Sequence, residues 1–349
     1  MIELSDLTKK FDTFTAVDHL NLRIETGEFF GLLGPNGAGK TTTISLMSTL
    51  LLPTEGEIRV DGEVLSRKNP GLKRKISVIT QEYSMRQDMT MDEVMEYQGR
   101  LYFMPRKKIR EKTEELLEFC GLIDFRRRTV RKLSGGMKRK LMVCRALLTE
   151  PEILLLDEPT AGMDALSRRQ MWNLLRQLND HNLTILLTTH YMEEAESLCQ
   201  RVAFMDRGRL EEVSEPKKMV EQLGHFAVDE MTSDGLKSHY FKNREDAIAH
   251  LSRLTGQTAL RNTTLEDVFV ARGRAEREAA VVNGNYNSIM GKMDGVPQRF
   301  LQDHSGGNDC TADVSDRVWN GNPDGVPRRT ISEFPDSGCG VTDNDDGQF

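Results

Sequence analysis

Hydrophobic and polar residues alternate near the start of the chain. The segment Leu20–Ile24 alternates residue by residue, and Glu57–Gly62 is a shorter alternating segment that ends in a turn. A period of two is typical of a strand with one buried face, so both segments predict an antiparallel β-edge within residues 1 to 80. The run Phe29–Leu33 is apolar throughout, which predicts a strand buried on both faces.

The pattern becomes helical between residues 81 and 148. Residues at helical spacing, most of them apolar, predict a mostly helical subdomain in this part of the chain. They are Met91, Val94, Met95, Gln98 and Leu101 in a first stretch and Ile109, Leu116, Leu117 and Phe119 in a second.

Strands and helices alternate from Ile153 to about Val213, and this alternation predicts a parallel sheet with flanking helices. Beyond it, Phe226–Val228 and a helix around Ala247–Leu254 predict a small βαβ-like piece. We therefore expect one α/β domain over 1–215, with its helical subdomain at about 81–148, and a small accessory α+β subdomain over 216–273.

The rest of the chain, 274–349, is crowded with asparagine, glycine and aspartate and has few apolar residues at any period. We expect it to be a disordered tail, and our hypothesis is that it is an unselected extension. Within it Asp294–Pro297 recurs as Asp324–Pro327. This is either a short binding repeat or, as we prefer, a coincidence of composition.

Composition excludes several classes of protein. The net charge of -7 exerts no general attraction on nucleic acid, and the mean hydropathy is -0.49. No window approaches the roughly 20 apolar residues of a spanning helix, and no secretory signal precedes Lys10. The five cysteines have neither metal-site nor disulfide spacing, so we expect reduced thiols. The basic run Arg126–Arg128 is a phosphate or lipid patch or, as we prefer, a solvated face.

A glycine-rich segment links the apolar run Phe29–Leu33 to a helix that we expect over Thr41–Leu52. It fits the pattern G-x-x-x-x-G-K-[ST], whose backbone N–H groups cradle phosphates at a helix N-terminus. Lys40 would reach the β- and γ-phosphates, and the Thr41 hydroxyl would ligate Mg²⁺. The alternative is a glycine-rich turn without a ligand. The segment comprises Gly34, Pro35, Asn36, Gly37, Ala38, Gly39, Lys40, Thr41 and Thr42.

Two carboxylates follow the apolar strand that begins at Ile153. Adjacent acids at the carboxyl edge of a parallel sheet lie where ligands bind in such folds. Asp157 fits the role of a Mg²⁺ ligand, and Glu158 fits that of the general base that takes a proton from the attacking water. Without the preceding phosphate loop, an apolar strand followed by two acids would be weak support for a catalytic site.

The segment Leu133–Met137 reads Leu-Ser-Gly-Gly-Met. Ser134 is a favoured helix cap, and a helix that begins at Gly135 and Gly136 would present free backbone N–H groups as an anion site. Taken alone, an ordinary cap after a loop is the competing interpretation.

With these three motifs in order, about three-quarters of the chain resembles the ATP-binding subunits of ABC transporters. The resemblance implies a P-loop nucleotide-hydrolase core that binds and hydrolyses ATP with Mg²⁺. It gives Gln81 a contact with Mg²⁺ and the attacking water, and it gives His190 a contact with the γ-phosphate. Asp164 matches the family's D-loop aspartate, and Phe11 occupies the place of the adenine-stacking ring, although a core phenylalanine is nearly as good an interpretation.

The resemblance also implies partners. Ser134 and Gly136 would complete the ATP site of a second ATP-binding subunit, which is another copy or a paralogue. A separate transmembrane permease would hold the chain on the cytoplasmic face of the cell membrane. The methionines of the helical subdomain would line a groove for a permease helix or, more simply, fill the core: Met85, Met89, Met91, Met95 and Met104.

The segment that ends in Leu265–Phe269 resembles the last helix of export-type subunits, those of drug-resistance and nodulation-factor exporters. The expected function is therefore to drive export of drugs, lipids or polysaccharide-like cargo. Two alternatives remain. A soluble ABC-type ATPase of translation, chromosome structure or DNA repair shares every nucleotide motif, and a regulatory module would bind ATP without turnover, against which Glu158 and His190 argue.

Overall fold

The structure is a computed structural model that describes residues 1–233 and 235–272. The expected tail with its repeated tetrapeptide, and the cysteines at 310 and 339, lie outside the described residues.

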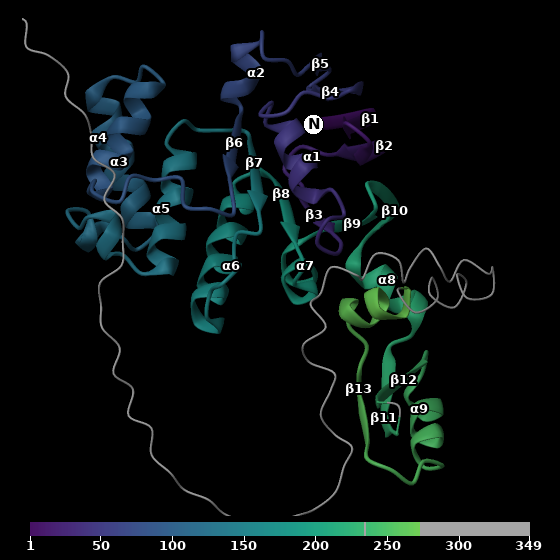
Figure 1. The fold of residues 1–349 in the computed structure, drawn as a ribbon. Helices are drawn as coiled ribbons and strands as arrows, with labels where there is room; N and C mark the ends of the chain where they lie inside the picture. The colour runs from purple at the N-terminus through teal and green to yellow at the C-terminus, as the bar shows by residue number, and fades with distance from the viewer. Residues whose placement is uncertain (234, 273–349) are drawn as a thin grey trace, which may run out of the picture. The chain divides into compact units, whose positions relative to one another are not determined.

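A six-stranded sheet forms the centre of the domain (Figure 1), with the strand order β10-β9-β3-β8-β7-β6. The strands from β9 to β6 pair in parallel, with helices in the connections between them, and this confirms the predicted α/β class. Their bounds are Phe29–Leu33 (β3), Ile76–Ile79 (β6), Ile153–Asp157 (β7), Thr184–Thr189 (β8), Arg201–Asp206 (β9) and Arg209–Ser214 (β10).

The last strand of this sheet departs from the prediction. β10 runs antiparallel to β9, whereas the alternation up to Val213 predicted a parallel sheet throughout. The reason is the connection: Arg207 and Gly208 both have positive φ angles and form a tight turn, and a tight turn can join only antiparallel strands.

Side chains of the parallel strands alternate between two hydrophobic clusters. Leu154, Leu156 and Leu187 belong to one cluster with the helices α3 to α7, while Leu155 and Leu186 belong to the other with α1 and a second sheet. Both faces of the central sheet are therefore covered, which is why its strands read as unbroken apolar runs.

The second sheet is antiparallel and has the order β2-β1-β4-β5. Along β2 the residues Leu20, Leu22 and Ile24 are buried while Asn21 and Arg23 are exposed, as the alternation predicted. The strands are Ile2–Phe11 (β1), Phe14–Ile24 (β2), Glu55–Val60 (β4) and Glu63–Val64 (β5).

The helix after the phosphate loop is shorter than predicted. α1 spans Lys40–Met47 instead of Thr41–Leu52. Thr49 has a φ of 61°, a left-handed conformation that ends the helix, and Leu50 is 61% exposed. The apolar residues after Met47 therefore lie on a surface loop.

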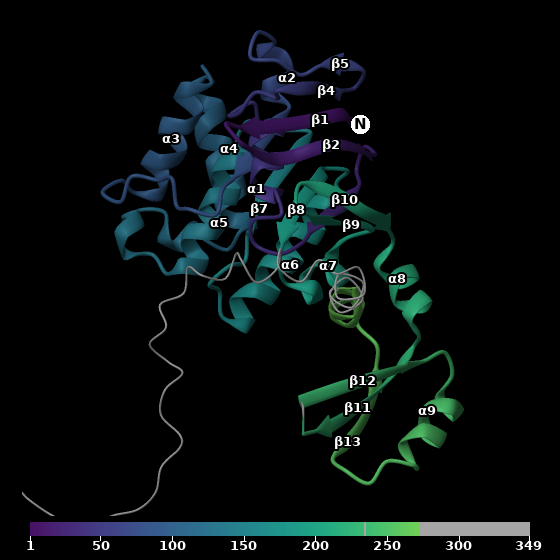
Figure 2. The ribbon, with the colours of Figure 1, turned by 45° about the vertical axis from the view of Figure 1, so that its right-hand side comes forward.

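The remaining helices of the domain follow the predicted periodicities, and the helical subdomain lies to one side of the central sheet in both ribbon views (Figure 2). Its methionines mostly fill the core: Met91 and Met95 are fully buried and Met85 is 8% exposed. The helices are α2 (Pro70–Arg74), α3 (Met91–Leu101), α4 (Arg106–Phe119), α5 (Gly135–Leu147), α6 (Ala165–Asp180) and α7 (Met192–Leu198), with 3₁₀ turns at Ile123–Phe125 and Val130–Lys132.

The accessory piece contains a strand that the sequence reasoning missed. β12 (Gly235–Phe241) and β13 (Thr258–Asn262) are both antiparallel to β11 (Phe226–Thr232), which lies between them. The predicted strand at Phe226–Val228 is present as β11, but the βαβ-like arrangement was wrong, because β11 forms a hairpin with β12 and pairs antiparallel with β13. The helices are α8 (Pro216–Leu223) and α9 (Arg244–Leu251), and residues 265–272 are also helical.

The accessory piece shares the hydrophobic core of the main domain. Met219, Leu265 and Val268 belong to the same cluster as α6 and α7, and the Phe269 ring stacks on the Phe204 ring with centroids 5.9 Å apart. Residues up to Arg272 therefore stabilise the α/β domain directly.

Candidate active site

The phosphate loop joins β3 to α1 and depends on glycine. Gly34, Gly37 and Gly39 all have positive φ angles. A Cβ at Gly34 would lie 2.1 Å from the Met205 carbonyl oxygen, and one at Gly39 would lie 2.4 Å from the Ala16 carbonyl oxygen. Side chains at these positions would collide with neighbouring backbone, so glycine allows the loop to lie close to β2 and β9.

Lys40 folds back over this loop. Its side chain is 6% exposed, and its ammonium donates to the carbonyl oxygens of Gly34 at 2.8 Å and Pro35 at 3.0 Å. Burial lowers the pKa of Lys40, and the charges of Glu158 and Asp157 oppose that shift. The ammonium is thus held at the mouth of the loop by neutral acceptors, for which phosphate oxygens would be stronger substitutes.

The Asp157 carboxylate, 4% exposed, lies beside the first turn of α1. Its Oδ1 accepts hydrogen bonds from the Thr41 hydroxyl at 3.2 Å and the Thr188 hydroxyl at 2.6 Å. Sequence reasoning did not identify Thr188, although it sits opposite Asp157 in the register of β7 and β8. The predicted pair Thr41 and Asp157 is therefore brought together and held by a third residue.

Glu158 follows β7 with a φ of 47°, a left-handed conformation that is uncommon for residues other than glycine and that recurs at active sites as well as in turns. Gln81 donates from Nε2 to Glu158 Oε2 at 3.4 Å, and His190 Nδ1 lies 3.2 Å from Glu158 Oε1. These residues follow β6, β7 and β8, whose carboxyl ends meet at one edge of the sheet. The structure brings the expected general base Glu158 together with Gln81 and His190, to which the resemblance gives contacts with the attacking water and the γ-phosphate.

Gln81 has a support that the sequence did not reveal. Arg139, in the second turn of α5, is 2% exposed and donates to the carbonyl oxygens of Thr80 at 2.7 Å and Gln81 at 3.0 Å. Burial lowers the pKa of this guanidinium. The helix that carries Ser134 at its start is thereby tied to the Gln81 backbone.

Ser134 is the N-cap of α5, as predicted, and its hydroxyl accepts a hydrogen bond from the Met137 N–H at 3.2 Å. Ser134 and Gly135 are exposed, and Gly136 is half-buried. The N–H groups of Gly135 and Gly136 belong to the first turn, where the helix itself offers no acceptor. This end of α5 is therefore able to receive an anion from outside.

Asp164 uses both carboxylate oxygens within its own helix. It caps α6, accepting from the Ser167 N–H at 2.9 Å and the Ser167 hydroxyl at 2.6 Å, and these bonds lower the pKa of the carboxyl. A Cβ at Gly136 would lie 3.3 Å from the same hydroxyl oxygen. The Asp164 turn thus borders the start of α5.

Phe11 is 42% exposed at the end of the β1–β2 hairpin, and the Lys9 ammonium lies 5.0 Å from the centre of its ring. The interpretation of Phe11 as a core residue was wrong. An exposed ring with a free face fits base stacking better than packing.

No helix among the described residues is long and apolar enough to cross a lipid bilayer. Within the same part of the chain, no group of three or more histidines, cysteines or acids gathers as a metal site.

Comparison with known proteins matches residues 17–161 to the family model described as ABC transporter. The chain is 33% identical to the linearmycin resistance ATP-binding protein LnrL of Bacillus subtilis, over 73% of this chain and 82% of that protein. It is 37% identical to the daunorubicin/doxorubicin resistance ATP-binding protein DrrA of Streptomyces peucetius, over 75% and 78%. It is 35% identical to the Nod factor export ATP-binding protein I of Cupriavidus metallidurans, over 76% and 85%.

Solved structures agree with these relatives. The dimeric post-hydrolysis state of the ATP-binding cassette MJ0796, bound to ADP and Pi, superimposes with a TM-score of 0.56 at 28% identity, covering 62% of this chain and 98% of that one. An ATP-binding subunit of an ABC transporter gives 0.58 at 26% identity, over 64% and 92%.

The chain belongs to the ATP-binding proteins of ABC transporters. It is an ATP-binding and ATP-hydrolysing transporter subunit, and its resemblance to the export-type subunits is confirmed. These relatives support the transporter interpretation and give no support to a soluble ATPase of translation, chromosome structure or DNA repair.

Proposed function

We propose that two ATP-binding subunits, each with this architecture, close around two ATP molecules and so drive export through a separate permease at the cytoplasmic face of the cell membrane. Export is supported by the names of the relatives, which describe drug resistance and Nod factor export. Cargo of the drug, lipid or polysaccharide-like class would be recognised by the permease, and nucleic acid has no part in the cycle.

One observation carries the hydrolytic part of this proposal. The Glu158 carboxylate lies between Gln81 and His190, one residue after the buried Asp157. In the proposed reaction Glu158 accepts the proton of the attacking water, Gln81 orients that water, and His190 contacts the γ-phosphate. Lys40 neutralises charge on the β- and γ-phosphates, and Phe11 stacks on adenine.

The oxygen donors beside the phosphate loop fit Mg²⁺. The Thr41 hydroxyl and the Asp157 carboxylate are hard ligands that already meet at one point, and Gln81 adds an amide oxygen nearby. These residues would hold the ion, which supplies neutralisation of phosphate charge.

In the proposed dimer, Ser134 and Gly136 at the start of α5 serve the ATP site of the opposing subunit. Ser134 is exposed while its hydroxyl caps α5, and the first-turn N–H groups of α5 have no acceptor within the helix, so this end would bind the γ-phosphate held by the opposing subunit, bordered by Asp164. The opposing subunit is a second copy or a paralogue.

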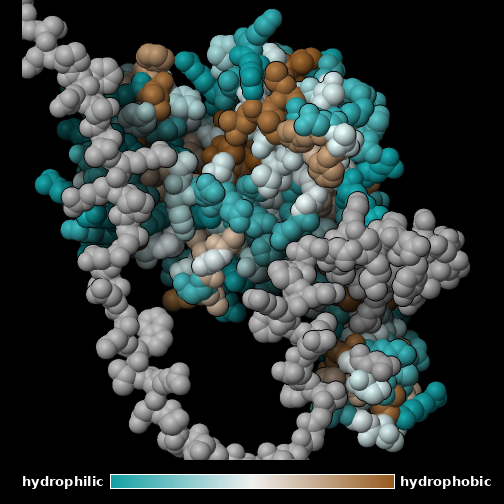
Figure 3. All heavy atoms as spheres, viewed as in Figure 1, coloured by the Kyte–Doolittle hydropathy of each residue, from teal (hydrophilic) through white to brown (hydrophobic). Residues whose placement is uncertain are grey.

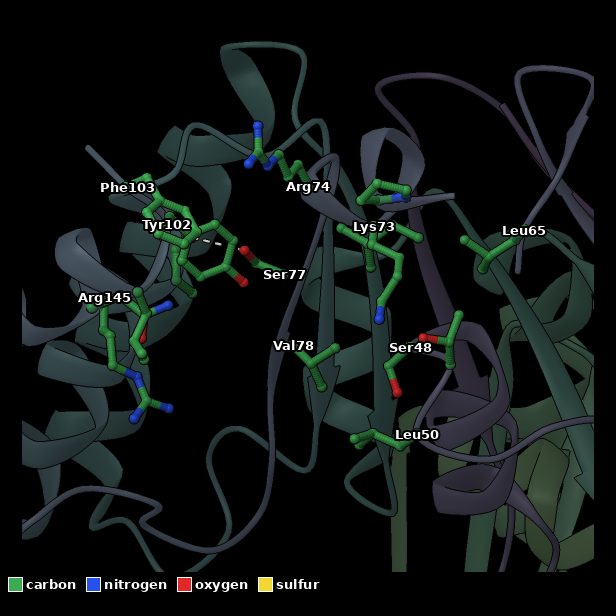
Figure 4. A pocket seen from close by; sticks show the side chains of 16 residues that line it. Ser48, Leu50, Leu65, Lys73, Arg74, Ser77, Val78, Tyr102, Phe103 and Arg145 are labelled. Carbon is green, nitrogen blue, oxygen red and sulfur yellow. Dashed lines mark hydrogen bonds between the residues drawn. The ribbon is translucent and has the colours of Figure 1, made fainter. Parts of the chain in front are cut away.

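We place the permease at a groove of about 450 Å³ between the central sheet and the helical subdomain (Figure 4). Tyr102, Phe103 and Arg145 line one side, while Leu50 and Lys73 line the other. The groove is open and combines apolar with basic side chains: Phe103 is 88% exposed and Leu50 is 61% exposed, and Lys73, Arg74 and Arg145 also line it. Figure 3 shows hydrophobic residues gathered on this face near α1 and α2. An apolar permease segment with an acidic residue would fit it.

The docking surface has its own test. Phe103→Asp should abolish co-purification with the permease while the isolated chain retains its ATPase rate, because Phe103 makes no contact with the catalytic side chains described above. Retention of the permease by this variant would contradict the docking site and leave the hydrolytic assignment intact.

The decisive experiment for hydrolysis is Glu158→Gln. Removing a general base costs about 10²–10⁴ in rate, so ATP turnover should fall by that factor while ATP binding remains and the dimer accumulates with ATP. Steady-state ATPase assays and size-exclusion chromatography with ATP measure both effects. Glu193→Gln, at an exposed glutamate on α7, is the matched control and should behave as the parent. A Glu158→Gln variant as fast as the parent, or monomeric with ATP, would refute the assignment.

A further inference from the structure

A fully buried carboxylate lies behind the catalytic edge. Glu194, on α7, has 0% of its surface exposed, and one of its oxygens accepts hydrogen bonds from the Thr160 hydroxyl at 2.8 Å and the Trp172 indole N–H at 2.9 Å. Thr160 belongs to the turn that starts at Glu158, whose carbonyl oxygen accepts from the Ala161 N–H at 3.2 Å. One carboxylate therefore ties α7 to α6 and to the turn that follows the general base.

The same helix begins next to His190. The His190 and Tyr191 rings have centroids 4.1 Å apart, and the Arg168 guanidinium lies 4.6 Å from the centre of the Tyr191 ring. Arg168 also donates a long hydrogen bond of 3.5 Å to the Met163 carbonyl oxygen. A series of contacts thus runs from the Asp164 turn through Arg168 and Tyr191 to His190.

Two buried side-chain atoms at this junction have no partner in hydrogen-bonding geometry among the described residues: the second carboxylate oxygen of Glu194, Oε2, and the Nε of Arg168, although the Thr189 hydroxyl also interacts with the Glu194 carboxyl and lowers its pKa. The ionised forms of the two side chains have opposite charges, and the Arg168 charge lowers the pKa of Glu194 although the two residues form no ion pair within 4.0 Å. Burial raises the pKa of Glu194, against the effects of its hydrogen bonds and of Arg168. A buried polar atom without a hydrogen bond lowers the stability of the folded protein, so a hydrogen-bonded ion pair between Glu194 and Arg168 would satisfy both atoms.

We propose that Glu194 and Arg168 are positioning residues for ATP hydrolysis. The two side chains pair when the Asp164 turn shifts on dimer closure, and this pairing places Glu158 and His190 in the positions that the reaction requires. Neither residue touches substrate. Glu194 acts through Thr160 on the turn after Glu158, and Arg168 acts through Tyr191 on His190. This inference rests on the proposed roles of Glu158, His190 and dimer closure.

A double-mutant cycle on the full-length chain tests the pairing, using Glu194→Gln, Arg168→Met and the combined variant. Glutamine retains an oxygen for Thr160 and Trp172 but removes the charge. Each single variant should lower kcat by about 2- to 30-fold, with KM for ATP and the melting temperature close to the parent's. Since both changes break one interaction, the combined variant should be no slower than the slower single variant.

Conservative and neighbouring variants separate this role from a merely structural one. Arg168→Lys keeps a positive charge and should restore kcat toward the parent relative to Arg168→Met. Arg169→Met and Glu193→Gln change the exposed neighbours and should match the parent. If Glu194→Gln fails to fold, the comparison of Arg168→Met, Arg168→Lys and Arg169→Met decides the question.

Three results would overturn the proposal: additive losses in log kcat, a lowered melting temperature with unchanged kcat in the folded protein, or an Arg168→Met variant as fast as the parent. The Glu158→Gln variant in the same assay tells the two proposals apart. If it is slow while the Arg168 and Glu194 variants are parent-like, only the positioning role fails. If Glu158→Gln is itself as fast as the parent, the hydrolytic assignment fails first.

Discussion

The two halves of the nucleotide site in this chain are built differently. Around the phosphate loop, Lys40 and Asp157 are buried and already engaged with neighbouring groups of their own subunit. At the start of α5, Ser134 and Gly135 are exposed, and the Ser134 hydroxyl serves only to cap its own helix among the contacts described above. The first half is ready to bind ATP alone, whereas the second has no ligand of its own to hold.

This difference predicts that binding and hydrolysis separate in the isolated subunit. The phosphate loop gains its geometry from backbone packing against β2 and β9, which no second chain supplies. The start of α5 offers unpaired first-turn amides, which become useful only when another subunit brings a phosphate to them. Substitutions on the two sides should therefore fail in different ways.

The largest effect is expected from Ser134→Arg. The bulky side chain fills the anion site, so hydrolysis should fall to the background rate while ATP affinity of the monomer stays at the parent value. ATPase assays and fluorescent-nucleotide titration measure the two quantities. Ser134→Ala is the milder companion and should cost about 1 kcal/mol of stability through loss of the cap. Full activity in Ser134→Arg would contradict the proposed division of the site, since hydrolysis would then not require the start of α5 from a second subunit.

Lys40→Met should come next. Removing one preorganised charge at the phosphates costs about 10²–10³ in rate, and here ATP affinity should fall as well because the loss lies in the binding half. Titration of the monomer distinguishes this variant from Ser134→Arg, which keeps its affinity. Lys75→Met, at a surface lysine paired with Asp61 and Glu152, is the control. Unchanged ATP affinity in Lys40→Met would show that the loop binds without its ammonium.

The smallest effect is expected from alanine substitutions at two glycines of the phosphate loop. Gly39→Ala forces a Cβ to within 2.4 Å of the Ala16 carbonyl oxygen, while Gly37→Ala meets nothing within 4 Å. Both positions have positive φ, so each pays about 1–2 kcal/mol of strain, and Gly39→Ala adds the collision. Melting temperature and ATP affinity should therefore drop further for Gly39→Ala. Equal losses would mean that conformation alone, and not close packing, fixes the loop.

The sequence predicted the phosphate loop and the acidic strand well because both depend on local patterns. An apolar run, glycines and a lysine specify a strand, a turn and a helix start within a few residues. The end of α1 was missed because the left-handed Thr49 is set by packing after the helix, and the residues beyond it remain apolar. The hairpin partner β12 was missed because its half-exposed residues lack a clear period of two.

Contacts across the sheet edge were the least predictable part of the site. Thr188 holds Asp157, and Arg139 holds the Gln81 backbone, but both contacts join segments far apart in the chain. These two contacts depend on the register of β7 and β8 and on the placement of α5 against the sheet, and neither can be read from local patterns in a single sequence. The capping of α6 by Asp164 was also missed, although it is a local contact and Asp is among the favoured N-cap residues.

The sharing of one hydrophobic core by the α/β domain and the accessory piece has a consequence for how the chain unfolds. Met219, Leu265 and Val268 cannot leave the common cluster without exposing apolar surface on α6 and α7. The two parts should therefore melt in a single cooperative transition, and a chain cut after residue 215 should aggregate. Exchanging accessory pieces between related subunits would succeed only when the residues that enter this core are exchanged with them.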